Sequence, residues 1–210
     1  MITLQLHRDQ LEWLTDELIS AGVREIGGVL VGEHIAEGVF RLADLSVQRF
    51  GGTASCFVSQ PRQHSEFLES FYKRTGSDFS RFNYMGEWHS HPLFRATPSE
   101  TDFRQMQELV EDGSGRLFAL LLVVRLAAAD QFELSAHIFQ ADLPPTRARV
   151  DLVSRNPGDA PKQRSWWKRT FKRRHSIQLA ASEEEFVVSD TPNLPINLNE
   201  SEECDDENTI

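Results

Sequence analysis

Two histidines separated by one residue, His89 and His91, precede Ser99 and Asp102 within a 17-residue stretch. In an extended segment, residues i and i+2 point to the same face, so both imidazoles can converge on one ion. Imidazole and carboxylate are the ligands of catalytic zinc, and Asp102 on the next element can supply the third. The stretch therefore predicts a strand that delivers the histidines, and a fourth position left for water.

A purely structural interpretation of the same stretch is also open. Two histidines can lie at the surface where a strand ends, and the Ser99 to Asp102 spacing fits a cap at the start of a helix. We expect that helix to begin with Thr97 as the cap, Pro98 in the first position and Glu100 in the third. This interpretation explains the helix start and leaves the paired histidines unexplained.

The remaining pattern predicts helices and strands in alternation. Glycines are unusually frequent in one expected strand, 25–32, and such glycines weaken a strand unless another backbone or a ligand approaches closely. The sequence predicts an α/β domain with a mixed sheet flanked by helices that ends near Gln140. Helices are expected at residues 8–21, 61–72 and 98–110, and strands at 25–32, 39–47, around Phe57, 81–89, 117–127 and 131–139.

The charge is distributed unevenly along the chain. Ten of the 32 acidic residues follow Ala181, where no Lys or Arg occurs, so the preceding chain is balanced in charge. Residues 155–175 carry eight Lys or Arg together with Trp166, Trp167 and Phe171. We expect a domain at 1–143, a basic aromatic extension at 144–180 and an acidic, disordered tail at 181–210. Such a segment can bind nucleic acid, an anionic membrane surface or an acidic partner. The interpretation that we favour is that it folds back on its own domain or pairs with the acidic tail.

Two isolated cysteines, Cys56 and Cys204, form neither a disulfide framework nor a CxxC metal site, which favours a reducing compartment. No apolar core of a signal peptide is recognisable near residue 1, so we expect no secretion signal. The longest apolar run, 117–129, is interrupted by Arg125 and fits a buried strand better than a membrane span. We therefore expect no membrane span and a cytoplasmic location.

A hydrolytic zinc site also needs a base that takes a proton from water. Four carboxylates are candidates, and their position in the sequence favours Glu87, two residues before His89, although a substrate-facing role fits Glu87 equally well. The other three candidates are Glu25, Glu33 and Glu100.

Two separated motifs together resemble the signature of the JAMM (MPN-plus, or JAB) zinc metalloproteases. They are Glu25-x-x-Gly28-x-Leu30-x-Gly32 and His89-Ser90-His91-Pro92 with Ser99-x-x-Asp102 downstream. The resemblance covers about residues 11–139. It implies an α/β sheet flanked by helices and one Zn²⁺ per chain, held by His89, His91 and Asp102. It further implies that Glu25 is the general acid/base and that Ser99 helps to hold the oxyanion.

The resemblance also implies a substrate class. These enzymes cut isopeptide bonds to ubiquitin-like proteins, and Gly86-Glu87-Trp88 with the helix at 61–72 is similar to the bacterial branch associated with conjugation operons and antiphage defence. We expect an isopeptidase that acts on a ubiquitin-like protein or its conjugates. The alternatives are a peptidase that trims a ubiquitin-like or sulfur-carrier precursor or removes a conjugated nucleotidyltransferase, and a binding module in which zinc only stabilises the fold.

Overall fold

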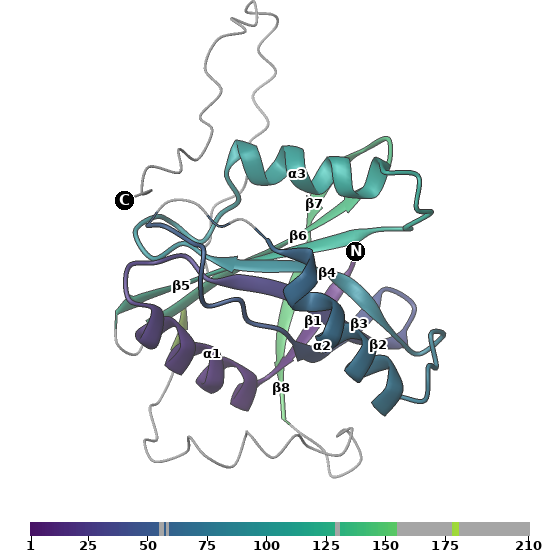
Figure 1. Cartoon of the computed structure of the whole chain (residues 1–210), viewed down its shortest axis with the longest axis horizontal. Helices are drawn as coiled ribbons and strands as arrows, with labels where there is room; N and C mark the ends of the chain where they lie inside the picture. The colour runs from purple at the N-terminus through teal and green to yellow at the C-terminus, as the bar shows by residue number, and fades with distance from the viewer. Residues whose placement is uncertain (55–56, 58, 129–130, 155–177, 181–210) are drawn as a thin grey trace, which may run out of the picture.

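A computed structural model describes residues 1–54, 57, 59–128, 131–154 and 178–180. Three helices flank a mixed sheet with the strand order β7-β6-β5-β4-β2-β3-β1-β8, and β9 pairs with β6 (Figure 1). This confirms the predicted α/β fold class. The helices are α1 (Arg8–Ala21), α2 (Pro61–Arg74) and α3 (Glu100–Glu111). The strands are β1 (Thr3–His7), β2 (Gly27–Ala36), β3 (Val39–Leu45), β4 (Phe82–Ser90), β5 (Ala119–Ala128), β6 (Gln131–Gln140), β7 (Leu143–Arg147), β8 (Arg149–Val153) and β9 (Gln178–Ala180).

The three predicted helices and the predicted β5–β6 hairpin are present, with ends shifted by a few residues. The prediction of a short strand around Phe57 is wrong, because Phe57 lies in a loop. The sequence missed β1, β7, β8 and β9, and β7 and β8 carry the sheet past residue 143 to Val153. The three-part division of the chain stays a prediction. The segments 155–175 and 181–210, as well as both cysteines, lie outside the described residues.

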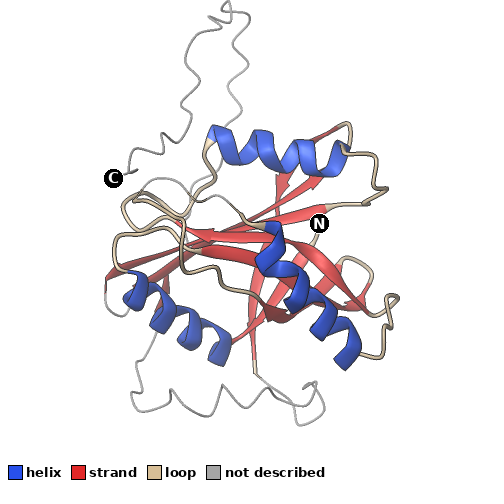
Figure 2. Ribbon diagram, in the orientation of Figure 1, coloured by secondary structure: helices blue, strands red, loops and turns tan. Residues whose placement is uncertain are grey.

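Helices α1 and α3 lie on opposite sides of the sheet (Figure 2). Alternate residues of a strand point to opposite faces. Leu30 of β2 and Leu122 of β5 pack with the α1 side chains, whereas Val29 packs with α2 and Leu121 packs with α3. Val29 and Leu121 are both register partners of Glu87 on β4, so α2 and α3 share one face. The strip of β4 between these two helices is the floor of the site.

The glycines of β2 allow close approach of other backbone segments, as the sequence predicted. A Cβ added at Gly28 would overlap the carbonyl oxygen of Ser46, and one at Gly27 would overlap the carbonyl oxygen of Trp88. The Trp88 indole is fully buried and donates a 2.8 Å hydrogen bond from Nε1 to the same Ser46 carbonyl. In the described part of the chain, no helix is long and apolar enough to cross a membrane.

Candidate metal centre and active site

His89 and His91 lie where β4 ends, between two neighbouring strands. His89 is the register partner of Gly27 on β2 and of Val123 on β5. The amide of His91 donates to the carbonyl oxygen of Val124 at 2.9 Å, so the chain continues its pairing for one residue beyond β4. Both imidazoles are buried, with exposed fractions of 6% and 8%. The sheet thus fixes the two rings on one face, as the i, i+2 spacing predicts.

Asp102 reaches the histidines from the first turn of α3. Ser99 is the N-cap of this helix: its Oγ accepts from the Asp102 amide at 3.2 Å, and Asp102 Oδ2 accepts from the Ser99 amide at 2.7 Å. The predicted cap at Thr97 is therefore wrong by two residues. The reciprocal pair of hydrogen bonds is available to Ser99 because a carboxylate stands three residues after it.

The three side chains form a compact triangle of possible ligand atoms. The Nε2 atoms of His89 and His91 are 3.0 Å apart, and they lie 3.4 Å and 3.7 Å from Asp102 Oδ2. Ligands on a tetrahedral zinc are about 3.3 Å from one another, given zinc–ligand bonds of about 2.0–2.1 Å. Two imidazoles and one carboxylate at these distances fit a zinc ion and leave a fourth position open.

The His91 ring is also oriented to coordinate a metal ion. His91 Nδ1 lies 3.0 Å from the carbonyl oxygen of Arg95, to which a protonated Nδ1 donates. This leaves the Nε2 lone pair directed at the triangle, an arrangement that metal-binding histidines commonly have.

The protonation states of the ligands favour a cation. Burial alone would raise the pKa of Asp102, but the hydrogen bond and charge of His89 and the hydrogen bonds from Ser99 lower it to about 2. Burial, and then the neighbouring His89, lower the pKa of His91. An ionised carboxylate and a neutral imidazole are the forms that bind a metal.

Glu25 lies beside this group, two residues before the start of β2. It is 5% exposed, and its amide donates to the Thr53 carbonyl at 2.7 Å. Burial raises the pKa of Glu25 to about 7, the charge of His89 lowers it, and the charge of Asp102 raises it. A carboxylate with a pKa near neutrality is well placed to accept and return a proton.

The other three candidate bases are less suited than Glu25 to take a proton from water at this site. Arg81 and Arg41 both form ion pairs with the Glu33 carboxylate. Glu100 is exposed on the first turn of α3. Glu87 lies on the face of the sheet that carries α2 and α3, and burial raises its pKa. The structure thus brings Glu25 together with the three possible ligands, while the Ser99 hydroxyl donates to Asp102 Oδ2 at 2.8 Å.

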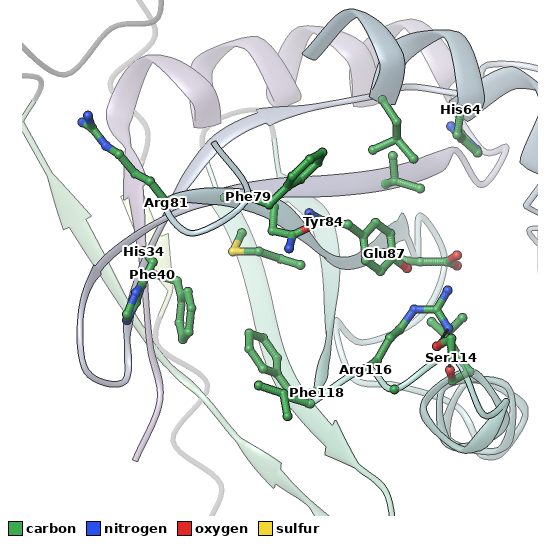
Figure 3. Close-up of a pocket in the computed structure, with 18 of the residues that line it drawn as sticks. His34, Phe40, His64, Phe79, Arg81, Tyr84, Glu87, Ser114, Arg116 and Phe118 are labelled. Atoms are coloured by element: carbon green, nitrogen blue, oxygen red, sulfur yellow. Dashed lines mark hydrogen bonds between the residues drawn. The ribbon is translucent and has the colours of Figure 1, made fainter. Parts of the chain in front are cut away.

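Two hollows meet at this site. The smaller one has a volume of about 370 Å³ and contains His89 and Asp102 in its lining. The larger one, which we call the α2–α3 cleft, has a volume of about 1010 Å³ (Figure 3). Sequence reasoning missed this cleft, because its walls come from separate elements that share no local pattern. It is lined by residues of β2, β3, β4, α2 and α3 and of the loops that contain Ser59, Phe79, Arg81, Ser114 and Arg116.

Comparison with known proteins agrees with this geometry. A curated protein of Enterobacter hormaechei subsp. hoffmannii (strain UCI 50), named CD-NTase/cGAS isopeptidase, is 26% identical over 162 residues, which is 73% of this chain and 84% of that protein. The solution structure of a Desulfitobacterium hafniense protein has the same fold. Its TM-score is 0.56 and its identity 17%, and the match covers 72% of this chain and 94% of that one.

A family match covers the described site. Residues 10–141 match the family described as prokaryotic homologs of the JAB domain, and this range contains Glu25, the two histidines and Asp102. The chain therefore belongs to the prokaryotic JAB-domain family.

Proposed function

We propose that this protein is a zinc-dependent isopeptidase that hydrolyses conjugates of a ubiquitin-like or similarly conjugated protein. The observation that carries the proposal is the position of Glu25, a buried carboxylate with a pKa near 7, beside His89, His91 and Asp102. The ligand atoms of these three residues all lie within 4.8 Å of one another. A hydrolytic centre needs such a combination of open metal site and proton carrier.

The proposed chemistry divides the work among four side chains. When bound by His89, His91 and Asp102, Zn²⁺ supplies Lewis acidity at the scissile carbonyl and lowers the pKa of water in the site. Glu25 takes one proton from the attacking water, a new C–O bond forms, and the C–N bond breaks. Glu25 then returns this proton to the leaving amine. The products are a carboxylic acid and the free amine of a lysine.

Ser99 has a further role in this proposal. Its hydroxyl would turn from Asp102 Oδ2 to donate to the carbonyl oxygen as negative charge develops there. The helix cap persists through the hydrogen bond between the Ser99 amide and Asp102.

The name of the Enterobacter relative favours one substrate among the alternatives. That protein is called an isopeptidase for a nucleotidyltransferase, so we propose that this chain releases a conjugated nucleotidyltransferase. The proposed setting is an antiphage pathway in the bacterial cytoplasm, with the basic extension and acidic tail as separate parts of the chain. Trimming of a ubiquitin-like precursor uses the same centre and differs only in the amine that leaves.

The assignment of Glu25 is tested with the full chain and a nucleotidyltransferase joined to a lysine through an isopeptide bond. Glu25→Gln should keep one zinc per chain and lose at least about 100-fold in kcat, because it removes the proton carrier and spares the ligands. His89→Ala should lose zinc and activity together. Glu100→Gln is the matched control, since this exposed carboxylate lies on the first turn of α3, and it should change neither. Full activity of Glu25→Gln would contradict the proposed mechanism.

A further inference from the structure

A row of residues crosses the sheet at the end of the site that carries Glu25. The antiparallel register of β2 and β4 sets Glu25 opposite His91, just beyond the paired residues. The parallel register of β4 and β5 sets Arg125 on the other side of His91, and Arg125 is the partner of Glu133 on β6. Because neighbouring strands are about 4.8 Å apart, the backbones at Glu25 and Arg125 are about 10 Å apart.

Arg125 points to the face of the sheet that carries the candidate metal site. Side chains alternate along a strand, and Leu121 and Val123, the preceding residues of this series, pack with α3. Arg125 lines neither the α2–α3 cleft nor the smaller hollow. The cleft contains Val29 of β2, which lies on the other side of the metal site from Glu25. The cleft and Arg125 are therefore at opposite ends of the site.

The guanidinium group of Arg125 is poorly satisfied. Its ion pair with Glu133 is long, with 3.8 Å between Nη1 and Oε2, which is too far for a hydrogen bond. Its Nε is buried without a partner, although 27% of the side chain is exposed. Arg49 shows the contrast: it donates to both carboxylate oxygens of Glu17, at 2.8 Å and 2.6 Å. Pairing with Glu133 is therefore not a sufficient explanation for Arg125.

The chemistry of this group selects its ligand. A guanidinium offers several N–H donors in a plane, and a carboxylate accepts two of them at once. In the proposed function Glu25 returns a proton to the leaving amine, so the amine leaves at the end of the site where Glu25 and Arg125 lie. Only four methylene groups separate the amine of a lysine from its Cα. The residues next to that lysine therefore pass within reach of Arg125.

We propose that Arg125 is a specificity-determining residue that binds a carboxylate at the leaving-amine end of the site. This inference rests on the proposed function, which sets the direction in which the amine leaves. The carboxylate belongs to an Asp or Glu next to the conjugated lysine, so the enzyme prefers lysines with acidic neighbours.

The same carboxylate chemistry has a second source in this chain. Strand β9 ends at Ala180, which is the partner of Glu133 and so belongs to the same row. Glu183, Glu184 and Glu185 follow within five residues. The test must therefore separate a carboxylate of the substrate from these three.

Two conjugates that differ only in the leaving peptide test the proposal with the full, zinc-loaded chain. In each, a nucleotidyltransferase is joined through an isopeptide bond to the lysine of an acetylated, amidated pentapeptide, Ala-Glu-Lys-Glu-Ala or Ala-Gln-Lys-Gln-Ala. The acidic conjugate should have a kcat/KM about fivefold or more above the neutral one, as expected for one charge-assisted pair at a partly exposed site. Because exposed charges are screened, this ratio should fall as salt is added.

Variants of the full chain assign the preference to Arg125. Arg125→Gln should abolish the ratio between the two conjugates, Arg125→Glu should reverse it, and Arg125→Lys should restore part of it. A purely structural role would change both conjugates alike and leave the ratio as it was. Arg8→Gln, which replaces an exposed arginine on α1, is the matched control and should keep the ratio. Zinc content and thermal unfolding check each variant, and Arg125→Met replaces Arg125→Gln if that variant does not fold.

Replacement of Glu183, Glu184 and Glu185 together by Gln separates the two sources. If these residues occupy Arg125, their neutralisation raises the ratio, and Arg125→Gln in the same chain removes the rise. If the ratio stays the same, the carboxylate is the substrate's alone.

Three outcomes overturn the inference: equal cleavage of the two conjugates both with and without the three Gln replacements, a ratio that Arg125→Gln keeps, or a ratio that Arg8→Gln also loses. Failure of the native chain to cleave either conjugate would overturn the proposed function and this inference with it. Equal cleavage would leave the proposed function standing, so the two failures are distinguishable.

Discussion

Replacement of Gly86 by alanine tests how the sheet supports the proposed metal site. Gly86 lies in the middle of β4 with a φ of 148°, and its register partners are Leu30 on β2 and Leu120 on β5. An added Cβ would overlap the carbonyl oxygen of Leu120 and lie 2.5 Å from its amide nitrogen. Both of these are backbone atoms, so no side chain can turn aside. In Gly86→Ala the two strands must separate by on the order of 1 Å, because interiors are close-packed.

The expected loss of stability has two parts. A non-glycine residue at this φ costs about 1–3 kcal/mol. Separation of the strands weakens the β4–β5 hydrogen bonds near Gly86, at about 1 kcal/mol for each bond. Together these give a destabilisation of about 4 kcal/mol, a large part of the roughly 5–15 kcal/mol that stabilises a typical domain. Because His89 also pairs with β5, we expect zinc affinity to fall by about tenfold or more.

Gly113→Ala is the matched control. Gly113 also has a positive φ, 76°, but no atom lies within 4 Å of an added Cβ, so alanine here bears only the cost of the backbone conformation, about 1 kcal/mol. Urea unfolding followed by far-UV circular dichroism compares the two variants, and metal analysis measures bound zinc. If Gly86→Ala is destabilised no more than Gly113→Ala, the argument from the strand contact is wrong.

Two further predictions concern the buried surroundings of the site. Trp88→Phe should lower the free energy of unfolding by about 2–3 kcal/mol, because it leaves a cavity and removes the indole donor of the Ser46 carbonyl. A loss below about 1 kcal/mol, measured by urea unfolding, would contradict this. Burial, with the charge of Arg147, lowers the pKa of His137 from 6.5 to about 4. Below about pH 6.5 His137 is therefore protonated in the unfolded chain and neutral in the folded chain. The free energy of unfolding should fall by about 2 kcal/mol between pH 6.5 and 4, allowing for partial exposure of the ring. His137→Leu should flatten this dependence, and an unchanged slope would refute the assignment.

The local patterns of the sequence were sufficient for much of the site. The i, i+2 spacing of the histidines and the start of α3 need only a strand and a helix, and both formed close to the expected bounds. The error of two residues at the helix start came from Thr97-Pro98, which is a good helix entry in isolation. Ser99 is the better cap because its amide donates a hydrogen bond to the Asp102 carboxylate in addition to the bond that its hydroxyl accepts.

Long-range pairing is the part that the sequence could not supply. β1 and β8 are five-residue strands that pair in parallel, with Thr3 opposite Arg149. Both strands alternate polar and apolar residues, but each has only five residues and no turn joins the two, so nothing local in the sequence identifies one as the partner of the other. The same limit applies to the base: Glu87 is nearest to the histidines in sequence, and only the resemblance to a known signature favoured Glu25. The β2–β4 register supplies the physical reason, since it sets Glu25 beyond His89 on the neighbouring strand.

The glycines of β2 and the carboxylate of Glu25 are two parts of one arrangement. A Cβ at Gly27 would meet the carbonyl oxygen of Trp88 and lie 2.9 Å from the Cβ of His89, so any larger residue would push the start of β2 away from the end of β4. Glu25 stands two residues before Gly27, and it would move away from the ligands together with the strand. Glycine at position 27 is therefore a condition for the proposed approach of Glu25 to the possible metal ligands. This gives a physical reason for a glycine-rich strand to follow directly after the carboxylate that we propose as the proton carrier.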